Sequence, residues 1–200
     1  MAQTSTTLIA SKEHMTPNIT GTDISLSATS GVYTIKANNT PPTALTGYGK
    51  LAVGDLIIVT GASNSANNTT FTVNTVVSTA EFTVVEVVTS ENAGASITLD
   101  HVGFVSTKSK GDGYYSQPDG VHTVAYQVAS DFNADATIKM QGTLATTPTE
   151  DDWFDIANTT FTADTSTVTS SYNFTGNYVW VRSKTQLLTA GTVNSILLNS

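Results

Sequence analysis

Short alternations of apolar and polar residues follow one another along most of the chain. In residues 31–37, Tyr33, Ile35 and Ala37 alternate with side chains that would point to the opposite face of a strand. Similar runs recur at a spacing of roughly ten residues, and no segment keeps the 3.6-residue apolar period of a helix. The pattern therefore predicts an all-β protein with antiparallel sheets and almost no helix. The predicted strands cover residues 31–37, 56–60, 70–77, 81–88, 94–100, 121–129, 136–144, 153–157, 165–174, 177–185 and 192–199.

The chain of 200 residues divides into four parts, and its length suits two small domains. Residues 1–23 have no strand or helix periodicity and include Pro17, so we expect an extended N-terminal arm. Residues 24–103 and 121–200 each repeat the rhythm of strands, and we expect each to form a small antiparallel β-sandwich or barrel domain. Residues 104–120 combine three glycines and one proline with a basic, polar run, which is typical of a linker.

Composition and charge limit the classes of partner. Charged residues make up only 12% of the chain, so hydroxyl and amide side chains must provide most of its solubility. The net charge of -8 argues against a nucleic-acid partner, because phosphate binding needs clustered basic residues. The closest basic pair, Lys108 and Lys110, fits a solvated linker. The chain has no cysteine, its longest aliphatic run (Leu56–Val59) is too short to cross a membrane, and we see no secretory signal.

Acidic residues gather in one short segment, where Glu150, Asp151, Asp152 and Asp155 lie within six positions. Such a group could bind calcium or supply the acid and base of a glycosidase. Catalytic carboxylates usually come from different strands, however, so we prefer a solvated turn. Residues 131–135 (DFNAD) begin like a calcium loop, but they lack the glycine and the glutamate expected further along, and we again prefer a structural turn.

The histidines offer no catalytic or metal-binding pattern. His14, His101 and His122 are isolated from one another, and none belongs to an H-x-H or H-E-x-x-H motif. The chain also has no G-x-S-x-G nucleophile motif. We therefore expect no enzymatic activity, no cofactor and no metal ion.

Five scarce side chains form our candidate interface: Tyr114, Tyr115, Tyr178, Trp180 and Arg182. The two adjacent tyrosines lie in the predicted linker, where they could contact a sugar or a protein partner, or clamp the two domains together. The other three alternate along one predicted strand, and Arg182 is the only arginine of the chain. Binding surfaces built from tryptophan and tyrosine are common at interfaces and in carbohydrate-binding modules of the β-sandwich type.

Two arrangements of that strand are open. If Val179 and Val181 point into the core, the aromatic residues and Arg182 form an exposed stripe suited to an interface. If the aromatic residues point inward, Arg182 lies at the strand end and pairs with a carboxylate such as Asp152 or Asp155. We favour the second arrangement and expect both tryptophans of the chain to pack in the core.

Two segments of the chain resemble structural proteins of marine and cyanobacterial tailed bacteriophages. The segment FTGNYVWVRSKTQLLTAGTVNSILLN, residues 174–199, is similar to a terminal β-sandwich segment of the form TGN-aromatic-x-aromatic-x-R followed by TAG and a last apolar strand. The segment VGDLIIVTGASNSANNTTFTVNTVV, residues 53–77, is similar to a small β-domain in which G-D-x-I-x-V-x-G leads through a polar loop to T-F-T-V. These motifs carry no catalytic residues.

The resemblance implies a non-enzymatic structural protein of the virion, most concretely an accessory or decoration protein on the capsid or tail. Its partners would be other virion proteins and further copies of itself, and we expect a trimer. It would assemble in the host cytoplasm and be released by lysis, without contacting nucleic acid or a membrane. The alternative is a carbohydrate- or receptor-binding module of a tail fibre or adhesin, with a host glycan as its ligand.

Overall fold

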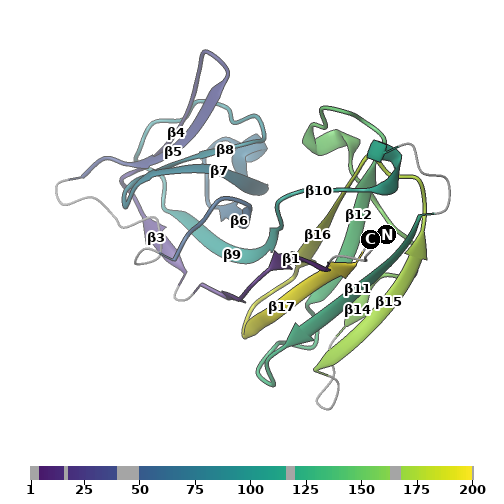
Figure 1. Cartoon of the computed structure of the whole chain (residues 1–200). Coiled ribbons are helices and arrows are strands. Elements are labelled where there is room, and N and C mark those ends of the chain that lie inside the picture. Colours follow the sequence, from purple (N-terminus) through teal and green to yellow (C-terminus); the bar gives the residue numbers. More distant parts are fainter. Residues whose placement is uncertain (1–4, 16–17, 40–49, 116–119, 163–167, 200) are drawn as a thin grey trace. The chain divides into compact units, whose positions relative to one another are not determined.

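A computed structural model describes residues 5–15, 18–39, 50–115, 120–162 and 168–199 (Figure 1). Within these ranges the chain consists of strands, turns and three short 3₁₀ helices, so the all-β prediction is confirmed. None of the described helices is long and apolar enough to cross a membrane. The chain forms two compact units. Residues up to His14 and from Val105 onward form the C-terminal unit, and Met15–Phe104 form the N-terminal unit.

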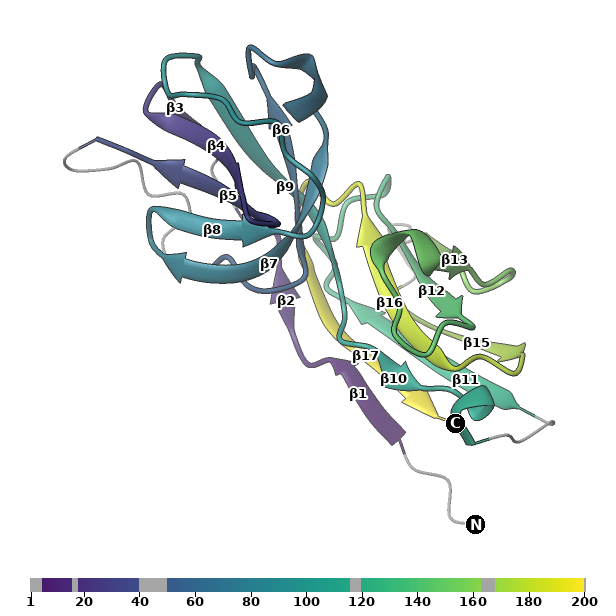
Figure 2. The ribbon, with the colours of Figure 1, turned by 90° about the horizontal axis from the view of Figure 1, so that it is seen from above.

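The C-terminal unit is a sandwich of two antiparallel sheets, parts of which can be followed in Figure 2. The first sheet contains, in spatial order, β1 (Ser5–Ile9), β17 (Thr192–Asn199), β11 (Val121–Val128) and β15 (Thr169–Thr175), and β2 (Lys12–Glu13) also pairs with β17. The second sheet contains β12 (Thr137–Thr143), β16 (Trp180–Gln186) and β10 (Ser109–Lys110), with β13 (Phe154–Asp155) and β14 (Phe161–Thr162) pairing with β12.

Tyr126 lies at the centre of the core between these two sheets. It is fully buried in β11, and its ring contacts Phe161 of the second sheet at a centroid distance of 5.9 Å. Its hydroxyl donates a hydrogen bond of 2.9 Å to the backbone oxygen of Thr159. This bond satisfies the one polar group that burial removes from water. Burial raises the pKa of Tyr126 strongly.

The N-terminal unit is an antiparallel sheet around a separate apolar core that includes Leu26, Ile35, Phe71 and Phe82. Its strands are β3 (Ile19–Gly21), β9 (Ile97–Val105), β6 (Asp55–Thr60), β7 (Thr70–Ser78), β8 (Glu81–Val84), β5 (Val32–Ala37) and β4 (Ile24–Thr29), in spatial order. The last residue of β9 already belongs to the C-terminal unit.

A carboxylate orders the polar loop that follows β6. Glu91 accepts hydrogen bonds from the backbone amides of Ser63 and Asn64 at 2.7 and 3.0 Å, and from the side chain of the buried Asn67 at 3.1 Å. Burial opposes ionisation of Glu91, but these hydrogen bonds outweigh it and lower the pKa. Asn67 belongs to the 3₁₀ helix η1 (Ser65–Asn67). Side-chain hydrogen bonds therefore fix much of this loop.

The prediction of an extended N-terminal arm needs correction, because the structure has three strands in this region. β1 and β2 pair with β17, and β3 pairs with β9, so most of the described residues before Asp23 belong to sheets. In β1 only Leu8 is buried, which leaves no apolar alternation to indicate a strand. β4 was also missed, although Ile24 and Leu26 are buried and alternate with serines.

The predicted linker at residues 104–120 is also corrected in its described part. Residues 109–110 form β10, and Asp112–Tyr115 form the 3₁₀ helix η2 of the C-terminal unit. Residues 116–119 lie outside the described ranges.

Candidate functional site

β16 directs alternate side chains to the two faces of the second sheet. Val181, Ser183 and Thr185 point into the sandwich and are at most 1% exposed. Trp180 and Arg182 point to the opposite, outer face, where Trp180 is half-buried. The favoured arrangement was therefore wrong for Trp180, which lies outside the core. β16 thus contributes only small and β-branched side chains to the space between the sheets. Trp180 covers the outer face together with the half-buried Trp153, which is outside the core as well.

Arg182 is buried even though it lies on the outer face, with 5% of its surface exposed. Its two terminal nitrogens donate to the two carboxylate oxygens of Glu150 at 2.8 and 2.7 Å, and its Nε donates to Oε1 of Gln141 at 2.9 Å. The guanidinium carbon lies 4.2 Å from the centre of the Trp153 ring. This bidentate pair with stacking makes Arg182 a structural anchor. The predicted partners, Asp152 and Asp155, were wrong, because Glu150 holds this position.

The rest of the acidic segment has structural contacts of its own. Asp152 accepts hydrogen bonds from the backbone amide and the hydroxyl of Thr149, and both bonds lower its pKa. Asp155 pairs with Lys139 and accepts a bond of 2.9 Å from Gln141. Burial opposes its ionisation, but these partners lower its pKa overall. In the described residues the preferred interpretation of this segment as a turn agrees with these contacts, and no metal-binding group of His, Asp or Glu is found there.

An exposed surface forms beside this anchor, which we call the aromatic–lysine patch: Lys108, Lys110, Tyr114, Tyr115 and Trp180. The ring of Tyr114 lies 5.1 Å from that of Trp180 and 5.2 Å from that of Tyr115, measured between centroids. The Lys108 ammonium lies 4.6 Å from the centre of the Trp180 ring, and the Lys110 ammonium lies 4.1 Å from that of Tyr114. Tyr114 and Tyr115 are 46% and 56% exposed. The patch thus combines open aromatic surface with two cations.

The backbone holds the patch through close contacts at two glycines. β10 pairs with β16, with Lys110 opposite Trp180. Just beyond β10, Gly111 donates to the backbone oxygen of Val179 at 3.0 Å, and Gly113 donates to that of Tyr178 at 2.8 Å. A Cβ atom at either glycine would clash with the Tyr178 backbone. Because η2 includes Gly113 and ends in Tyr114 and Tyr115, these contacts fix the place of both rings.

Tyr178 belongs to a different group of aromatic residues. Its ring lies 5.9 Å from Phe154, 6.2 Å from Phe174 and 6.4 Å from His122, measured between centroids. Gly142 and Gly176 leave the room that this ring occupies. Burial raises the pKa of Tyr178. Of the five predicted interface residues, the structure therefore brings Tyr114, Tyr115 and Trp180 together on the surface, and it assigns Tyr178 and Arg182 to packing.

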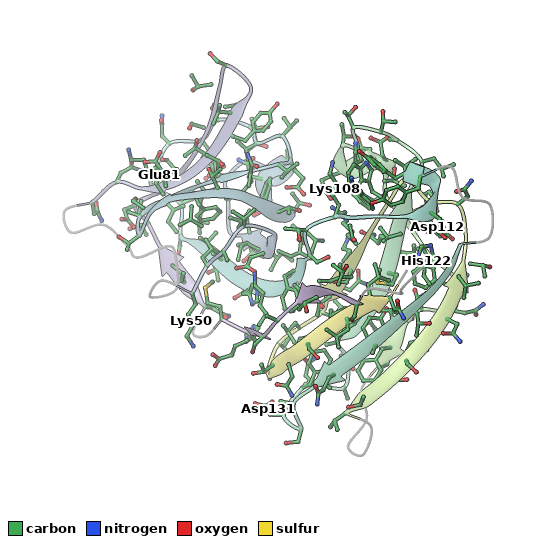
Figure 3. All side chains as sticks on the ribbon, viewed as in Figure 1. Lys50, Glu81, Lys108, Asp112, His122 and Asp131 are labelled. Carbon is green, nitrogen blue, oxygen red and sulfur yellow. The ribbon has the colours of Figure 1, made fainter. Side chains whose placement is uncertain are left out.

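The three histidines are buried. His122 stacks on Phe174, and its Nε2 lies 4.0 Å from a carboxylate oxygen of Asp112 in η2. Figure 3 shows Lys108 and Asp112 at one end of the C-terminal unit and Asp131, the start of the DFNAD turn, at the other. Asn133 fixes that turn by accepting from the backbone amides of residues 189 and 190. In the described structure the DFNAD segment is therefore a turn, as we preferred.

Sequence reasoning missed the two lysines and Glu150. The segment KSKGDGYY contains the signal for the patch, since it places two alternate lysines beside two glycines and two tyrosines. What this surface can do is bind: its rings offer apolar area, and its ammonium groups offer charge to an anionic partner. The chain matches no known family model, and no curated protein was found to be similar to it in sequence.

Proposed function

We propose that this chain is a non-enzymatic structural protein of a tailed-bacteriophage virion, which binds neighbouring virion proteins on the capsid or tail through the aromatic–lysine patch. The observation that carries the proposal is the patch itself, in which Tyr114, Tyr115 and Trp180 gather on a surface fixed by backbone contacts. Rigid, partly exposed aromatic residues are what protein interfaces use as anchors. The resemblance of residues 53–77 and 174–199 to phage structural proteins supplies the virion context.

The remaining surface supports an assembly role. Only 12% of the residues are charged, and the outer face of the first sheet pairs small polar groups, such as Thr123 with Asn173 and Ser195 with Gln127. A surface of this kind stays hydrated without strong charge. Repeated copies on a symmetric particle turn modest contacts into firm attachment. We propose a homo-oligomer, with a trimer as the specific expectation, which light scattering on the purified chain measures directly.

The experiment for the main proposal is binding to particles. Mass spectrometry of purified virions from the source phage should detect the chain, and the purified chain should bind particles that lack it. The double variant Tyr114→Ala, Tyr115→Ala should lose this binding while its thermal unfolding stays near that of the parent. Val87→Ala, at a valine that is 71% exposed in the N-terminal unit, is the matched control and should bind normally. Absence of the chain from virions rejects the proposal.

A glycan-binding module is the second candidate, and the exposure of the Tyr115 ring favours it. Sugars stack on such rings through their apolar faces. Binding of the isolated chain to a glycan array, lost in Tyr115→Ala, would replace the structural proposal. Binding to assembled particles alone supports the structural one.

A further inference from the structure

β10 is an edge strand of the second sheet. In the described part of the C-terminal unit it pairs with β16 on one side and with no strand on the other. Ser109 lies opposite Val181, and Gly111, two residues on, donates to Val179. Backbone groups of successive residues in an antiparallel strand point alternately to the two sides. The backbone groups of Lys108 and Lys110 therefore point away from β16, as a further strand would require.

The two lysines repeat at the period of a strand. Lys108 and Lys110 are two positions apart, which separates equivalent atoms by about 7 Å in an extended chain. Both are exposed, and both ammonium groups lie over rings of the patch. The nearby carboxylate of Asp112 faces His122. A chain with a net charge of -8 thus presents a local pair of cations along an open edge.

We propose that an extended acidic segment of a partner protein adds as a strand to the open edge of β10. Its carboxylates, at alternate positions, lie on the same face as Lys108 and Lys110 and pair with their ammonium groups. This inference rests on the proposed function, because it names the chemistry of the protein partner. Main-chain hydrogen bonds supply affinity in such strand addition, and opposite charges on facing strands select the sequence.

An acidic peptide fits this edge better than an acidic polysaccharide does. The open donors and acceptors of β10 have the spacing of a peptide strand, which a sugar chain does not reproduce. The faces of Trp180 and Tyr114 that a sugar would stack on each hold a lysine ammonium. A carboxylate can bind these ammonium groups while they remain over the rings.

The test uses the full chain and three capped heptapeptides. The first alternates threonine and aspartate, the second replaces every aspartate by asparagine, and the third has the first sequence with N-methyl groups at alternate residues, which block strand pairing. Titrations followed by NMR should show binding of the first peptide, with shifts in the amides of residues 108–115 and in the Trp180 indole. The asparagine peptide should bind about fivefold more weakly, since two opposite-charge pairs are lost. The N-methylated peptide should not bind.

A charge-matched pair of variants completes the test. Lys108→Gln with Lys110→Gln should weaken binding of the aspartate peptide about fivefold, to the level of the asparagine peptide. Lys36→Gln with Lys50→Gln removes the same charge from the N-terminal unit and should leave the affinity unchanged. The inference is overturned if the N-methylated peptide binds as tightly as the first peptide. It is also overturned if the two double lysine variants bind the aspartate peptide equally well. So does binding of a polygalacturonate oligosaccharide in place of the peptide.

This experiment separates the two proposals. If the chain is found in virions and binds them through Tyr114 and Tyr115, but the aspartate peptide fails to bind, the proposed function stands and the acidic strand is wrong. If the peptide binds but the chain is absent from virions, the acidic strand stands and the virion role is wrong.

Discussion

Replacing Arg182 by methionine tests the anchor on the outer face of β16. The change removes three hydrogen bonds, two of them to the carboxylate of Glu150, and the stacking on Trp153, while it keeps most of the aliphatic volume. Removing one partner of a buried pair costs about 3–5 kcal/mol when the other partner is left buried. Here the Glu150 side chain keeps 30% exposure and can return to water. We therefore expect a smaller loss, of about 2–3 kcal/mol in the free energy of unfolding.

Urea unfolding followed by tryptophan fluorescence is the appropriate assay. The only two tryptophans, Trp153 and Trp180, both lie in the C-terminal unit, so the signal reports the unit that contains Arg182. Lys184→Met is the control, since it removes a positive charge from the same face of β16 two residues away. It should change stability by less than about 0.5 kcal/mol. If Arg182→Met were no more destabilising than this control, Arg182 would not be an anchor, and an interface role would have to be reconsidered.

Three further predictions follow from particular contacts. Tyr126→Phe leaves the Thr159 carbonyl without its donor and should destabilise the C-terminal unit by about 1–2 kcal/mol in the same urea assay. In the parent, the pKa of Tyr126 is raised in the folded state, so its contribution to folding stability is complete below the unfolded pKa of about 10. This contribution is lost progressively as pH rises above about 10, and alkaline unfolding should begin in that range. Gly111→Ala forces the backbone away from Tyr178, so it should abolish binding of the chain to particles through the patch and should alter Trp180 fluorescence. Unchanged binding to particles would show that the patch does not depend on this close contact. Glu91→Gln should speed hydrogen exchange at the amides of Ser63 and Asn64, and the stabilising effect of Glu91, present above the unfolded pKa of about 4.3, should fade as pH falls through its lowered folded value.

Most strands with buried alternation could be predicted because each repeats the same simple pattern, although β4 was missed. β7 is an example, since Phe71 and Val73 are buried and alternate with threonines. β1 could not be predicted, because it lies at a sheet edge and buries only Leu8. β1 pairs with β17, near the other end of the sequence. The local pattern of apolar and polar residues does not predict contacts between segments so far apart in the sequence.

The site was harder to predict than the fold because both faces of β16 are covered. Val181 meets the core, while Trp180 and Arg182 meet the segment that contains Thr146 and Glu150. Alternation alone distinguishes two faces but does not say that the outer one is also covered. The aromatic residues of the patch could be singled out in the sequence because such side chains are scarce in it. Their grouping depends on the pairing of β10 with β16, and the glycine-rich sequence around β10 does not predict that pairing.

We propose that the aromatic–lysine patch is buried against a neighbouring protein in the virion. Hydroxyl-radical footprinting of intact virions and of the free chain, read out by mass spectrometry, measures this directly at Tyr114 and Tyr115. We expect strong oxidation of both tyrosines in the free chain, where they are about half exposed, and clear protection in the virion. Equal oxidation of the two tyrosines in both states would contradict it.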